Sequence, residues 1–111
     1  MMATWEDIRA VALTLPGVRE TQSMGEPCFK FGRRGVVHLW GKRALMKLDP
    51  GRQELLFEVR PDVFEPFTAG AMRWSLVEIE ALEADEIGEL VREAWRCVVP
   101  KKVSRASVPA A

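Results

Sequence analysis

The stretch Cys28–Asp49, CFKFGRRGVVHLWGKRALMKLD, limits what this chain can fold into more than any other part. Apolar residues alternate with other residues in three short runs, as in strands that bury one face. Glycine and basic residues separate the runs at 32–35 and 41–43, where tight hairpin turns favour glycine. The stretch therefore predicts a three-stranded antiparallel meander. The side chains expected on its buried face are Phe29, Phe31, Val37, Leu39, Ala44, Met46 and Leu48.

The same meander concentrates positive charge. The chain of 111 residues has sixteen basic and sixteen acidic residues, and its net charge is zero. Six of the basic residues and a single acid, Asp49, lie in the meander, which gives it a net charge of +5. Residues 1–27 carry −2 and residues 50–111 carry −3. An anionic partner is therefore expected to bind at the meander.

The rest of the chain predicts three helices and one further strand. The helices are expected at Trp5–Leu13, from Asp49-Pro50 to before Pro61, with Leu55, Leu56 and Val59 on the buried side of this second helix, and at Ala84–Val98. The strand is expected at Trp74–Glu80, with loops at Arg19–Pro27 and Arg60–Gly70. The order α-β-β-β-α-β-α predicts a two-layer α+β sandwich, in which helices back an antiparallel sheet. One domain is expected over residues 4–100, followed by a disordered basic tail at 101–111.

Several classes of protein are disfavoured. Cys28 and Cys97 form no metal motif and are expected to be buried, reduced thiols, and His38 is the single histidine. No signal peptide or membrane span is visible, so we expect a cytoplasmic protein that does not bind membranes. No pattern typical of a nucleophile or a phosphate loop is present. We therefore expect no enzyme, no metal and no cofactor.

Two functions fit the meander. Basic side chains with aromatic rings between them favour weak, sequence-independent binding to the phosphates of DNA. The candidate residues are Lys30, Arg33, Arg34, His38, Trp40, Lys42, Arg43 and Lys47. The two basic turns should lie at opposite ends of the sheet, about 17–20 Å apart. Charge at hairpin tips also discourages strand aggregation without any ligand.

The second candidate function is a protein-interaction module or a homodimer that uses the outer face of the sheet. Four apolar residues are expected there: Trp40, Leu45, Trp74 and Leu76. If they form an exposed patch, they would mark a partner surface. The alternative is that the Arg60–Gly70 segment, with Phe64 and Phe67, folds over them.

Several short patterns occur together in a particular order. They are Leu15–Glu20 (LPGVRE), Gly25-x-Pro27-x-Phe29-Lys30-x-x-x-Arg34, Leu45–Leu48 (LMKL), Trp74 at a strand start, and Glu93–Lys101 (EAWRCVVPK). Together they resemble the MmcQ/YjbR family over about Ile8 to Lys102. The resemblance implies a secretion-chaperone-like α+β fold, also described as a double-wing arrangement, and a DNA-binding role.

The chain departs from that resemblance at two places. It has Arg34-Gly35-Val36-Val37 where many relatives carry a Lys-Met-Phe-like run after the first hairpin turn. It also has Gly70-Ala71-Met72-Arg73 where relatives commonly carry a polar segment with His or Asn. In the second segment Arg73 is the one remaining polar candidate, and it joins the list of candidate nucleic-acid-binding residues.

Overall fold

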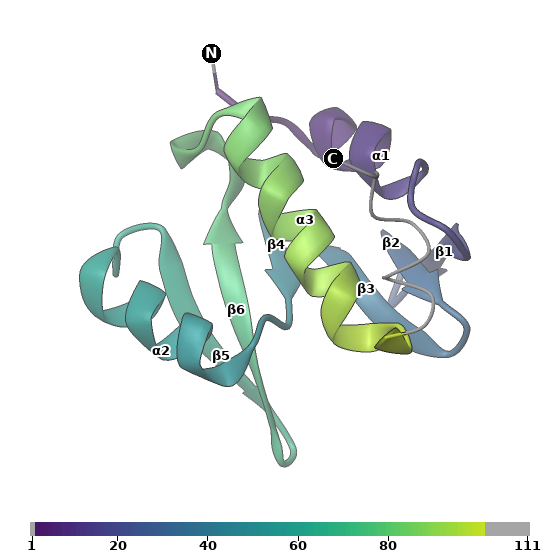
Figure 1. Cartoon of the computed structure of the whole chain (residues 1–111). Helices are drawn as coiled ribbons and strands as arrows, with labels where there is room; N and C mark the ends of the chain where they lie inside the picture. The colour runs from purple at the N-terminus through teal and green to yellow at the C-terminus, as the bar shows by residue number, and fades with distance from the viewer. Residues whose placement is uncertain (1, 102–111) are drawn as a thin grey trace.

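The computed structural model describes residues 2–101 and has an α+β fold, a six-stranded antiparallel sheet with three helices (Figure 1). The helices are α1 (Trp5–Ala12), α2 (Pro50–Val59) and α3 (Ala84–Val98), with a short 3-10 helix η1 at Ile79–Ala81. The strands are β1 (Val18–Ser23), β2 (Glu26–Phe31), β3 (Arg34–Trp40), β4 (Arg43–Met46), β5 (Phe64–Ala69) and β6 (Met72–Glu78). Their order in the sheet is β1-β2-β3-β4-β6-β5. The expected fold class is confirmed.

The helices cover one face of the sheet and enclose the core. α3 crosses the sheet and packs on β3, α1 lies against α3, and α2 lies beside β5 (Figure 1). Five of the seven residues expected on the buried face of the meander are almost completely buried, and Phe31 and Leu39 pack against them half-buried. The alternation of apolar residues thus predicted the correct inner face.

Local signals set the ends of the helices. At α1 the Thr4 hydroxyl accepts a hydrogen bond from the Asp7 amide, and the Asp7 carboxylate accepts one from the Thr4 amide at 2.8 Å. This capping box satisfies amides that have no partner within the helix. Asp49 caps α2 before Pro50, as expected. α3 has the bounds that the sequence predicts.

Two segments that were expected to be loops are strands. β1 lies within the expected loop Arg19–Pro27 apart from its first residue, and β5 lies within the expected loop Arg60–Gly70. Both are edge strands with one neighbour each, and neither has a clear alternation of apolar residues. Pro66 in β5 is tolerated because an edge strand has one unpaired side. The observed order is therefore α-β-β-β-β-α-β-β-α.

Other expectations need smaller corrections. Phe29 pairs with Val37 and Lys30 with Gly35, so Val36 is an additional residue in β3. This bulge resets the alternation. Strict alternation with Val37 on the buried face predicts Val36 on the outer face, but Val36 is also buried in the core.

In α2 the exposed fractions are 51% for Leu55 and 59% for Val59, which were expected to be buried. The helix buries Gln53 with Leu56 instead. Burial of the Gln53 amide is possible because it forms hydrogen bonds with the backbone of Leu48 and Arg73. Cys97 is exposed rather than buried, while Cys28 is buried.

The outer face of the sheet is partly closed by its own aromatic rings. Leu45 and Leu76 are cross-strand neighbours and are both buried, so no open four-residue patch exists. The Trp40 and Phe67 rings meet edge to face with centroids 5.1 Å apart. Phe67 comes from the segment that was proposed to cover this face, whereas Phe64 is buried in the core under the helices. The covering interpretation therefore holds for Phe67 alone.

Candidate nucleic-acid interface

A groove of about 750 Å³ opens at one end of the sheet. Four segments meet there: the β2–β3 turn, the connection from β4 to α2, the start of β6 and the last turn of α3. We call it the basic groove. Its lining residues are Arg33, Arg34, Gly35, Lys47, Leu48, Asp49, Pro50, Met72, Trp74, Cys97 and Val98.

Three of the expected nucleic-acid-binding residues line the basic groove. Arg33 and Arg34 are exposed and Lys47 is half-buried. Within residues 2–101 none of the three forms an ion pair, whereas eight other ion pairs occupy most of the arginines elsewhere. Cations without a carboxylate partner remain available to an anionic ligand.

Asp49 is the one acid in the lining of the groove. Its Oδ2 atom accepts hydrogen bonds from the Gly51 amide at 3.1 Å and the Arg52 amide at 3.3 Å. The carboxylate is thus used as the cap of α2. With three cations and one carboxylate the formal charge of the lining is +2, which favours an anion.

Two further candidates lie beside the basic groove. The His38 imidazole meets the Trp74 indole edge to face, with ring centroids 5.8 Å apart. A Cβ atom added to Gly35 would collide with that imidazole, so glycine allows His38 to lie close to the strand. Burial and the neighbouring Lys30 ammonium lower the pKa of His38, which favours the neutral ring. Lys30 itself pairs with Gly35 across the sheet.

The remaining candidates lie elsewhere. Trp40, Lys42 and Arg43 are at the other end of β3, as the meander geometry predicts. The Arg43 guanidinium is paired with Glu65 and Glu78.

Arg73 points to the helix-covered side of β6. Its guanidinium lies over the Phe57 ring, 5.2 Å from the centroid, and Nη1 is 3.1 Å from Oε1 of Glu54. Of the nine candidates, three thus line the basic groove, Lys30 and His38 lie beside its Gly35 wall, and four lie elsewhere.

The other walls of the basic groove have no signal in the sequence. Leu48, Cys97 and Val98 come from segments that the fold brings together, and no local pattern marks them. The sequence placed Trp74 on the outer apolar face and in the family pattern, but not among the nucleic-acid-binding candidates. Its position in β6, two residues after the exposed Met72, places the indole in the wall of the groove.

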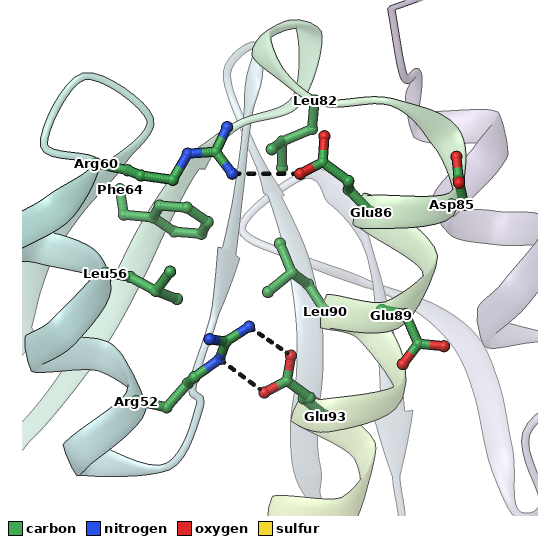
Figure 2. Close-up of a pocket in the computed structure, with 10 residues that line it drawn as sticks. All are labelled: Arg52, Leu56, Arg60, Phe64, Leu82, Asp85, Glu86, Glu89, Leu90 and Glu93. Atoms are coloured by element: carbon green, nitrogen blue, oxygen red, sulfur yellow. Dashed lines mark hydrogen bonds and ion pairs between the residues drawn. The ribbon is translucent and has the colours of Figure 1, made fainter.

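A second pocket, of about 320 Å³, lies between α2 and α3 and is unsuited to an anion. Figure 2 shows that two ion pairs cross it. Arg52 Nε is 3.1 Å from Glu93 Oε1, and Arg60 Nη1 is 3.2 Å from Glu86 Oε2. Its lining also carries Asp85 and further carboxylates, and the apolar floor around Leu56 is buried. Both arginines here are already neutralised.

The described residues form neither a metal site nor a membrane span. No group of three or more His, Cys, Asp or Glu side chains that could hold a metal ion occurs within residues 2–101. In that part of the chain no helix is long and apolar enough to cross a membrane.

The fold and the groove define a small α+β protein with a basic, partly apolar site at one end of an antiparallel sheet. The sequence model of the YjbR family matches residues 13–97, and the chain belongs to this family. It is similar in structure to Deinococcus radiodurans protein DR2400, a crystal structure described as containing a DUF419 domain. The two share 25% sequence identity with a TM-score of 0.77 over 99% of this chain and 92% of that one. No curated protein matches the sequence.

Proposed function

We propose that the protein binds nucleic acid weakly and without sequence preference, through phosphate contacts in the basic groove. One observation carries the proposal: Arg33, Arg34 and Lys47 line a single concavity and lack ion-pair partners among the described residues. Each phosphate neutralised by such a side chain releases condensed counterions, which makes binding sequence-independent and sensitive to salt. The DNA-binding role that the family resemblance implies agrees with this chemistry.

A protein partner or homodimer at the outer sheet face receives less support. Trp40 and Phe67 are in contact with each other, and Leu45 beneath this face is buried. Such rings would have to separate, or be contacted only at their exposed edges, before a partner could bind. We therefore rank this function second.

The test is a fluorescence-anisotropy titration of labelled DNA at several salt concentrations. The variant Arg33→Ala/Arg34→Ala removes two positive charges from the groove, and Lys42→Ala/Arg43→Ala removes two from the other end of β3. The groove variant should bind less tightly, and its slope of log K against log salt should become shallower by roughly 0.9 for each phosphate that it no longer neutralises. The matched control should bind almost as the parent protein does.

Two results would contradict the proposal. DNA binding that is absent even at low salt would exclude nucleic acid as the ligand, and the outer face would then be tested through Trp40→Ala for loss of self-association. Equal losses in the two variants would show that net charge alone governs binding, without a defined site.

A further inference from the structure

We infer that the basic groove accommodates an unpaired nucleotide, with its base against Trp74 and its phosphate at Arg33, Arg34 and Lys47. This inference rests on the proposed function and makes it more specific. It assigns a single-stranded segment, or a free nucleotide of the same chemistry, in preference to duplex DNA.

The lining of the groove has two chemical parts. One part is cationic, and the other is apolar, with Trp74, Met72, Leu48 and Val98. A surface that contacts phosphates alone needs no apolar wall. A ligand that joins an anion to a flat apolar ring would use both parts, and a nucleotide has this composition.

Duplex DNA would leave the apolar part of the groove unused. Bases in a duplex stack on one another and offer only their edges to a protein. An unpaired base exposes its faces, and stacking on an aromatic side chain then adds to the phosphate contacts. The groove volume of about 750 Å³ falls within the range of roughly 300–1,000 Å³ that is usual for small-ligand sites.

Trp74 is already held in place without a ligand. The edge-to-face contact with His38, at 5.8 Å between centroids, supports the indole on one side, and Phe67 is its cross-strand neighbour. Gly35 makes this arrangement possible because a larger residue would displace the imidazole. A ring that is fixed before binding loses little side-chain entropy when a base stacks on it.

Asp49 sets the orientation of the ligand. Its carboxylate remains at the start of α2, where two backbone amides donate to it, and it would repel a nearby phosphate. The phosphate is therefore expected to be held by Arg33, Arg34 and Lys47, away from the start of α2. The exposed thiol of Cys97 also lines the groove, so a bound nucleotide should shield it from reagents.

The experiment compares single-stranded and duplex oligonucleotides of equal length, together with a mononucleotide, using the full chain. Single strands should bind roughly tenfold more tightly than duplex, because stacking of one base accounts for a factor of about this size. Trp74→Ala should remove this preference, and Trp74→Phe should retain most of it. Trp40→Ala is the matched control and should keep the preference. Circular dichroism establishes that each variant is folded.

The rate of Cys97 labelling by a thiol reagent gives a second readout that does not depend on the label on the DNA. Single-stranded DNA should slow the reaction in the parent protein and much less in Trp74→Ala. Equal protection by duplex and single strand would contradict the inference.

The outcomes separate the inference from the proposed function. If the Arg33→Ala/Arg34→Ala variant loses binding but duplex binds as well as single strand, the proposed function stands and the inference is wrong. If the mononucleotide binds and neither oligonucleotide does, the groove takes free nucleotides and the nucleic-acid function fails. If none of the three ligands binds, both are overturned.

Discussion

Gln53 offers the sharpest test of how this fold is held together beside the groove. Its exposed fraction is 2%, and it joins α2 to strand β6 and to the connection between β4 and α2. Oε1 accepts from the Leu48 amide at 3.0 Å and from the Ser75 hydroxyl at 3.1 Å, and Nε2 donates to the Arg73 carbonyl at 3.0 Å. Replacing the glutamine would leave three polar groups without their partner.

We predict that Gln53→Met lowers the free energy of unfolding by about 3 kcal/mol. Methionine has a similar length and fills most of the space, so the loss comes from three unsatisfied groups at about 1 kcal/mol each. Gln53→Ala should cost about 1–2 kcal/mol more, since it also leaves a cavity. Urea denaturation followed by circular dichroism measures both values.

Two controls make this prediction specific. Glu58→Ala, at an exposed position of the same helix, should change stability by no more than about 0.5 kcal/mol. Ser75→Ala should restore part of the loss in a Gln53→Met background, because it removes one of the unsatisfied groups. A cost below about 1 kcal/mol for Gln53→Met would refute the reasoning, since it would mean that water or side-chain movement satisfies the buried groups.

Three further predictions concern single side chains. Burial and a neighbouring lysine lower the pKa of His38 below 6.5 in the folded protein, so the unfolded chain binds the proton more readily. The free energy of unfolding should therefore fall as the pH drops below about 6.5. His38→Gln should reduce this dependence when urea midpoints are measured against pH. A thiol reagent should label Cys97 in the native protein and Cys28 only after unfolding, and rapid labelling of both would contradict the structure. The rate of Cys97 labelling should rise with pH, because partial burial and nearby carboxylates raise the pKa of this thiol. Arg43→Ala breaks two surface ion pairs and should cost less than about 1 kcal/mol in the same denaturation assay, so a larger loss would show that these pairs are not solvent-screened.

The fold was predictable from the sequence where a segment is buried on one face. The alternation in the meander and the apolar stripe of α3 both reflect contact with the core, so their bounds and faces were largely correct. The edge strands β1 and β5 were not predicted because they bury little, and backbone pairing with a neighbour defines them. Val36 was assigned to the wrong face because a bulge cannot be read from alternation.

The candidate site was predicted only in part, for a different reason. Charge clustering identified Arg33, Arg34 and Lys47 as candidates. It identified Lys42 and Arg43 equally, because it carries no information on the surroundings of each side chain. The outcome depended on contacts between distant segments, such as the pairing of Arg43 with two glutamates. Local sequence contains no information on such contacts until the strand order is known.

The strand order also determines when the groove can exist during folding. β4 pairs with β6 rather than with its successor in the chain, so α2 and β5 lie within the loop that this central pairing closes. Local hairpins assemble quickly, whereas such non-local contacts form late because a long loop must be closed first. The walls of the groove come from segments on both sides of the β4–β6 pairing and from the end of α3. A partly folded chain would hold the basic turn and lack the pocket, so the groove is present only once the β4–β6 pairing and α3 are in place.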